Sequence, residues 1–205
     1  MIRRNVIIAL IVLIAVLLSI QFLDARIAIG IMRFIRSVHP ISKMTEHIPD
    51  ILPHLVGAGT IILWLFYFFR MRHKVFDEET KFLRLAATVL PASYLVKTFS
   101  KIIFGRTGPR DWLIHHQTLT FRWMEIWSSS FPSGHMIVFV AFGTAVLVYY
   151  PKYRRLVISL LILLALALIL TDYHFLSDVI AGAYIGYMTT YLTNYFYEEQ
   201  YKEHQ

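Results

Sequence analysis

A histidine and a carboxylate stand four positions apart in "YHFLSD", as His174 and Asp178. On a helix this spacing puts both side chains on one face. A carboxylate bonded to one ring nitrogen fixes the histidine tautomer and leaves the other nitrogen to act as a base or nucleophile. The alternative is a purely structural His–Asp pair. A carboxylate at the edge of an apolar segment favours the functional interpretation.

The segment "FPSGH" contributes Ser133, Gly134 and His135 just before an apolar run. If a helix starts here, its free amides and the positive end of its dipole form a site for an anion. Glycine lets an oxygen approach the backbone closely. The alternative is an ordinary helix start in which Ser133 is only the cap.

Cations gather in "KIIFGRTGPR", which contains Lys101, Arg106 and Arg110, and Arg122 follows in the same long connection. The arginine fork matches two phosphate oxygens, and lysine supplies a point charge. The alternative is a belt of side chains that extend towards a membrane surface. Together with the two histidine segments, these cations indicate a phosphate site.

Two other kinds of chemistry are less favoured. His115 and His116 have no carboxylate partner at a ligand spacing, so they are interpreted as loop residues and no metal site is expected. A serine protease that acts within a membrane would use Ser133 as nucleophile. Such enzymes resemble Gly-x-Ser-Gly at the serine, whereas Phe131 stands at the first glycine here.

The composition predicts a membrane protein. Of 205 residues, 57% are hydrophobic and only 16% are charged, against about 25% charged in soluble domains. The net charge of +7 is spread over short connections between apolar segments, so nucleic acid is not expected as a partner. The chain has no cysteine, which excludes disulfides and thiolate metal sites.

The elements that must position these residues are apolar helices. A spanning helix needs roughly 20 mostly apolar residues, and six candidates follow one another at 6–23, 51–69, 82–104, 134–150, 156–171 and 178–197. The first is too long for a signal-peptide core of roughly 7–15 residues and is expected to be retained.

We therefore expect an all-α, polytopic membrane protein: a single domain (1–205) that is a six-helix bundle, with helical or loop segments outside the membrane. Residues 24–50 are interpreted either as an interfacial helix or as an ordinary loop helix.

Lys and Arg in the connections indicate the orientation. Both termini, "RMRHK" and "KYRR" fall on one side, which is expected to be cytoplasmic. The three candidate site segments fall on the other side, where the additional cations suit a phosphate ligand.

At this point the motifs resemble the type-2 phosphatidic acid phosphatase superfamily. The resemblance rests on Pro132-Ser133-Gly134-His135, on "HFLSDVIAG" and on Lys101 with Pro109. It implies that the catalytic core of this domain spans about 82–197. It implies that His174 attacks phosphorus, that Asp178 orients it and that His135 protonates the leaving oxygen. It implies that Lys101 and the amides of Ser133 and Gly134 hold the phosphoryl oxygens, with no metal or other cofactor.

The resemblance is incomplete at two arginines. The family has Arg-Pro where this chain has Gly108-Pro109, and it has Ser-Arg where this chain has Ala167 and Leu168. Arg106, Arg110 or Arg122 is expected to substitute in a variant enzyme. The alternative is a degenerate member that binds phosphate but hydrolyses it poorly.

The expected activity is hydrolysis of a lipid phosphate or diphosphate at the extracytoplasmic face, in a bacterial inner membrane. Phosphatidic acid, phosphatidylglycerol phosphate, undecaprenyl diphosphate and lipid A all remain candidate substrates, and membrane lipids are the expected surroundings. The alternatives are phosphoryl transfer to a second lipid and a non-catalytic phospholipid-binding protein.

Overall fold

A computed structural model of the chain describes residues 2–36, 48–124 and 129–203, and in these ranges it is helical without a named strand. An isolated antiparallel bridge joins Arg106 to Phe121. The elements, in chain order, are α1 (Ile2–Leu18), the π-helical turn η1 (Ser19–Leu23), α2 (Asp24–Arg36), α3 (Ile48–Arg72), α4 (Glu78–Phe104), α5 (Pro109–Leu113), α6 (Gly134–Tyr149), the 3-10 turn η3 (Pro151–Tyr153), α7 (Arg154–Leu170) and α8 (Leu176–Glu203).

Each of the six apolar runs predicted from the sequence is helical. Three stretches are long and apolar enough to cross a membrane: Asn5–Phe34, Ile51–Arg72 and Pro151–Leu170. Gly134–Tyr149 is apolar but shorter. Most large apolar side chains of α1, α3 and α7 are exposed, as expected for helices that face lipid. The structure thus confirms the all-α class, and three of the described helices are long and apolar enough to span a membrane, whereas six spans were predicted.

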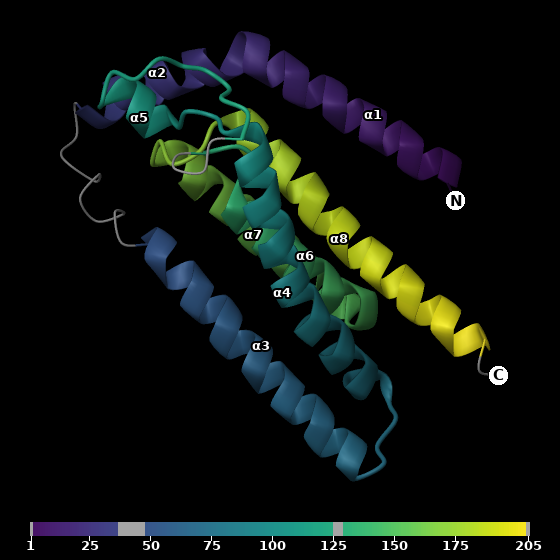
Figure 1. Cartoon of the computed structure of the whole chain (residues 1–205). Coiled ribbons are helices and arrows are strands. Elements are labelled where there is room, and N and C mark those ends of the chain that lie inside the picture. The colour runs from purple at the N-terminus through teal and green to yellow at the C-terminus, as the bar shows by residue number, and fades with distance from the viewer. Residues whose placement is uncertain (1, 37–47, 125–128, 204–205) are drawn as a thin grey trace.

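Helix α6 lies at the centre of the bundle, between α4 and α8 (Figure 1). Helix α3 packs on α4, α1 packs on α8 and α7 packs on α6. The long helices alternate in direction, so α2, α5 and the first turns of α6 and α8 lie towards one end of the bundle (Figure 1). We call this the site end.

Two glycines allow α8 to lie directly on α6. A Cβ at Gly182 would stand 2.6 Å from the backbone oxygen of Ser133, and one at Gly186 would stand 2.4 Å from that of Ile137. Small residues four apart permit this close contact between membrane helices. The contact brings the first turn of α6 against the first turn of α8.

The N-terminal helix is longer than the predicted span. Instead of ending near residue 23, the helix continues through η1 into α2. Both interpretations of residues 24–50, an interfacial helix and an ordinary loop helix, include a helix, and residues 24–36 are helical. Residues 37–47 lie outside the described ranges. The first residue of α2, Asp24, is almost completely buried against the rest of the site end.

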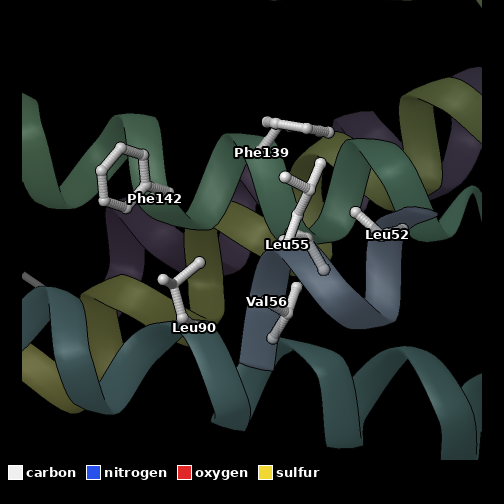
Figure 2. Close-up of a pocket in the computed structure, with 7 residues that line it drawn as sticks. Leu52, Leu55, Val56, Leu90, Phe139 and Phe142 are labelled. Atoms are coloured by element: carbon white, nitrogen blue, oxygen red, sulfur yellow. The ribbon is translucent and has the colours of Figure 1, made fainter. Parts of the chain in front are cut away.

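An apolar pocket of about 140 Å³ lies between α3, α4 and α6 (Figure 2). Its lining is Leu52, Leu55, Val56, Leu90, Val138, Phe139 and Phe142. Val138 and Phe139 stand three and four positions after His135 on α6, so the pocket begins about one helical turn from that histidine.

Candidate active site

Three of the site residues predicted from the sequence, Lys101, Arg110 and His174, line a polar cavity of about 200 Å³ at the site end. The lining comes from the end of α4, from α5, from the loop before α6 and from the turn before α8: Lys101, Gly108, Pro109, Arg110, Asp111, Ser129, Ser130, Tyr173 and His174. Segments more than 70 residues apart in the chain therefore meet around one small space. The cavity is large enough for a phosphoryl group.

His174 faces this cavity with Asp178 behind it. The Nδ1 atom lies 3.5 Å from Oδ2 of Asp178, and both side chains are buried. Neither ring nitrogen has a hydrogen-bond partner within the described residues. Burial lowers the pKa of His174 below its ordinary value of 6.5, with Asp178 opposing the shift. The imidazole is therefore neutral at pH 7, the state a nucleophile needs.

The Asp178 carboxylate is held by two hydrogen bonds, one to each oxygen. Its Oδ1 accepts a hydrogen bond from Nη1 of Arg106 at 2.7 Å, and its Oδ2 accepts one from the Phe175 amide at 3.0 Å. The same Oδ2 is the atom nearest to His174. The carboxylate thus has a fixed rotation that directs one oxygen at the imidazole.

His135 is the second histidine of the site. It is buried in the first turn of α6, and its ring centroid lies 6.4 Å from that of His174. Its Nε2 has no hydrogen-bond partner among the described residues. His135 does not line the cavity itself, but its ring contacts the ring of Tyr173, and Tyr173 does line the cavity. With a phosphoryl group between them, a neutral imidazole and a protonated one would suit a nucleophile and a general acid.

Ser133 begins α6 as expected from its residue type. Its Oγ accepts a hydrogen bond from the Met136 amide at 3.4 Å, which is the N-cap interaction. Its own amide donates to the Asp178 carbonyl oxygen at 3.0 Å and so ties α6 to α8. The amides of Gly134 and His135, the first two of the helix, have no acceptor inside it.

The four predicted phosphate-binding cations lie in different environments. Lys101 and Arg110 both line the cavity. Arg110 also donates to the Thr171 carbonyl oxygen at 2.9 Å and lies over the ring of Tyr173. Arg122 is exposed and outside the cavity lining.

Arg106, in contrast, is 1% exposed and bonded to carboxylates. Its Nη1 contacts Asp178 and its Nη2 contacts Asp24, both at 2.7 Å. The structure therefore pairs this predicted phosphate ligand with two carboxylates and does not include it in the lining of the cavity.

Three charged residues near the site were missed in the sequence. Asp24 ends an apolar run and has no motif around it. Lys97 packs across Gly134, where an added Cβ would stand 2.8 Å from Lys97 Cγ. Lys97 is four positions before Lys101, so both lysines lie on one face of α4. This spacing is the sequence feature that could have indicated that Lys97 lies near the site. Asp172 lies in the turn before α8, and burial raises its pKa to about 6 against the effect of Arg110.

The two histidines that the sequence places in a loop lie outside the site. His115 and His116 are exposed and do not line the cavity. Among the described residues, no group of three or more His, Cys, Asp or Glu side chains is arranged to hold a metal ion.

Comparison with known proteins gives one family. The model of the PAP2 superfamily matches residues 82–202, from α4 through α8. Neither the curated proteins nor the solved structures gave a significant match. The matched range contains His135, His174 and Asp178, together with the cavity-lining cations Lys101 and Arg110. The elements α1, η1, α2 and α3 precede it. The chain belongs to the PAP2 superfamily, whose members are generally phosphatases that act on phosphate esters, often lipid phosphates.

Proposed function

We propose that this protein is a membrane lipid phosphatase that works through a phosphohistidine intermediate. The observation that carries the proposal is the pair of buried imidazoles. His174 and His135 lie with ring centroids 6.4 Å apart beside a cationic cavity, and the Asp178 carboxylate backs the first of them. Displacement at phosphorus needs the attacking and leaving atoms on opposite sides of one centre.

In the first step, Nε2 of His174 attacks phosphorus and the bond to the lipid oxygen breaks. Because Asp178 lies beside Nδ1, that nitrogen keeps the proton and Nε2 carries the lone pair. His135, entering the step protonated, donates its proton to the leaving oxygen. In the second step, His135 takes a proton from water, the hydroxide attacks phosphorus, and the P–N bond breaks to release inorganic phosphate.

Charge on the transferred group is neutralised by Lys101, by Arg110 and by the first amides of α6. Donors that are already oriented stabilise the transition state without reorganisation. In this mechanism Ser133 starts the helix that supplies the amides. No metal or other cofactor takes part, since side chains supply the positive charge and the proton.

Arg110 is the best substitute for the missing family arginines. The family arginine expected before the catalytic turn is replaced by Leu168. Arg110 lines the cavity and bonds to Thr171, three residues before His174. This position supports an active variant with a relocated arginine. Gly108 and Leu168, which stand where the family has arginine, favour the alternative, a non-catalytic phospholipid-binding member.

A lipid substrate is supported by the surroundings of the site. Apolar helices flank the cavity, and the apolar pocket in Figure 2 begins about one turn beyond His135. An acyl chain fits such a pocket better than a polar leaving group does. Phosphatidic acid, phosphatidylglycerol phosphate, undecaprenyl diphosphate and lipid A stay within this class.

We also propose six membrane spans, formed by α1, α3, α4, α6, α7 and α8. The alternating directions put Arg70, Arg72, Lys152, Arg154 and Arg155 at the end opposite the site. By the positive-inside rule that end faces the cytoplasm. The site then faces the extracytoplasmic side of a bacterial inner membrane.

The test is phosphate release by the purified protein in detergent, with EDTA present, from each candidate lipid. His174→Ala should abolish release. His115→Ala, an exposed histidine outside the cavity, is the matched control and should retain it. Chromatography of the lipid products separates hydrolysis from transfer to a second lipid. Binding of lipid phosphate by folded protein without release from any substrate would favour the non-catalytic alternative.

A further inference from the structure

The site end contains a buried charge network that reaches outside the matched family region. We propose that Asp24, on the N-terminal helix, is a positioning residue that acts on the His174–Asp178 pair through Arg106. The inference rests on the proposed function, because it concerns the same nucleophile. It assigns a role in the reaction to a segment 58 residues before the start of the family match at residue 82.

The contacts form a continuous chain from α2 to the catalytic turn. Nη2 of Arg106 contacts Oδ2 of Asp24, and Nη1 contacts Oδ1 of Asp178, each at 2.7 Å. Ser177 closes the network: its amide donates to Oδ1 of Asp24 at 3.0 Å, its hydroxyl donates to Oδ2 of Asp24, and its Oγ accepts from Nη1 of Arg106. None of these four residues is more than 1% exposed.

The charges explain why a second carboxylate is needed. With Asp178 alone, the buried Arg106 guanidinium would neutralise the carboxylate that faces His174. Asp24 compensates Arg106, so the network keeps one net negative charge behind the imidazole. When His174 attacks phosphorus, its ring becomes positive, and this negative charge stabilises it.

The geometry explains how Asp24 reaches the nucleophile. Arg106 occupies Oδ1 of Asp178 and leaves Oδ2 directed at Nδ1 of His174. Asp24 holds Arg106 by the other Nη atom and holds the start of α8 through Ser177. Loss of its charge frees the guanidinium to rotate, and the carboxylate then loses its fixed direction. A misplacement of about 1 Å at a reacting centre can cost about 100-fold in rate, which sets the scale of the expected loss.

The experiment compares the full-length wild type with Asp24→Asn and with the double variant Asp24→Asn/Arg106→Gln. The single variant keeps the shape but removes one charge, and the double variant removes both buried charges so that no arginine is left unpaired. Thr190→Val is the control for stability. It removes a buried hydrogen bond from α8 to the Ala141 carbonyl oxygen, away from the cavity. Steady-state kinetics on a lipid phosphate and thermal unfolding in detergent are measured for each protein.

We expect kcat of both Asp24 variants to fall about 10–100-fold through misplacement of the nucleophile, with KM within about twofold, because Asp24 does not touch the substrate. Thr190→Val should unfold at a lower temperature with kcat unchanged. A wild-type kcat in Asp24→Asn would overturn the positioning role. Full recovery of the wild-type kcat in the double variant would overturn it as well, because that variant restores the net charge of the network but not the contacts that direct the Asp178 carboxylate. Failure of both variants to fold would assign Asp24 a purely structural role and would also overturn the positioning role. An inactive wild type would instead contradict the proposed function itself.

Discussion

Replacing Gly182 by alanine tests whether the packing of α6 on α8 sets the geometry of the site. The new Cβ would lie 2.6 Å from the Ser133 carbonyl oxygen and 3.0 Å from Met136 Cβ. Ordinary contact starts at 3.4 Å, so the helices must separate by about 0.8 Å at the first turn of α6. This turn carries His135, and the Ser133 amide bonds to the Asp178 carbonyl oxygen. The shift therefore changes the distance between His135 and His174.

The expected size of the effect follows from two opposing terms. Alanine favours a helix over glycine by about 1 kcal/mol, whereas overpacking costs about 1–3 kcal/mol. Stability should therefore change by no more than about 2 kcal/mol. Activity should change much more, because a misplacement of about 1 Å at a reacting centre can cost about 100-fold.

The assay is the initial rate of phosphate release, measured with thermal unfolding in the same detergent. Gly57→Ala is the matched control, since a Cβ there meets nothing within 4 Å. We expect Gly182→Ala to lose about 10–100-fold in kcat, and Gly57→Ala to keep it. Equal rates for the two variants would refute the argument that this contact positions the histidines.

Three further outcomes follow from the site. Lys101→Met should lower kcat/KM by about 100-fold or more, whereas Lys152→Met at the opposite end should leave it unchanged; equal losses would remove Lys101 from the site. Ser133→Ala should lower the free energy of unfolding by about 1 kcal/mol through loss of the α6 N-cap, and an unchanged denaturation midpoint would contradict that role. Because the pKa of His174 is lowered from 6.5, the nucleophile should stay neutral and active as the pH falls to 6.5. The decline in kcat/KM assigned to it should begin only below that value, and a decline already complete at pH 7 would be inconsistent with a buried His174.

The helices could be predicted well from the sequence because apolar length is a local property. The predicted span at 82–104 lies inside α4, and the one at 178–197 lies inside α8. The boundaries were less exact. Helix α8 runs on to Glu203 through a polar segment that hydropathy does not detect, and the first helix passes Asp24 because no proline interrupts it there.

The site could be predicted only where its residues lie in short motifs. His174 and Asp178 are one helical turn apart, and "PSGH" marks a helix start, so both were visible in the sequence. The pairing of Asp24 with Arg106 joins residues 82 positions apart, and no periodicity indicates it. For the same reason, Arg106 was grouped with the phosphate-binding cations from its neighbours in the chain, whereas the structure pairs it with two carboxylates.

The central claim is that His174 becomes phosphorylated, and trapping that intermediate tests it most directly. The protein is mixed with a ³²P-labelled lipid phosphate, quenched in alkali within milliseconds and digested, and the labelled peptide is identified by mass spectrometry. We expect an alkali-stable, acid-labile label on His174 that is absent from His174→Ala and retained by His115→Ala. Rapid phosphate release with no labelled histidine, or with the label on another residue, would contradict the account.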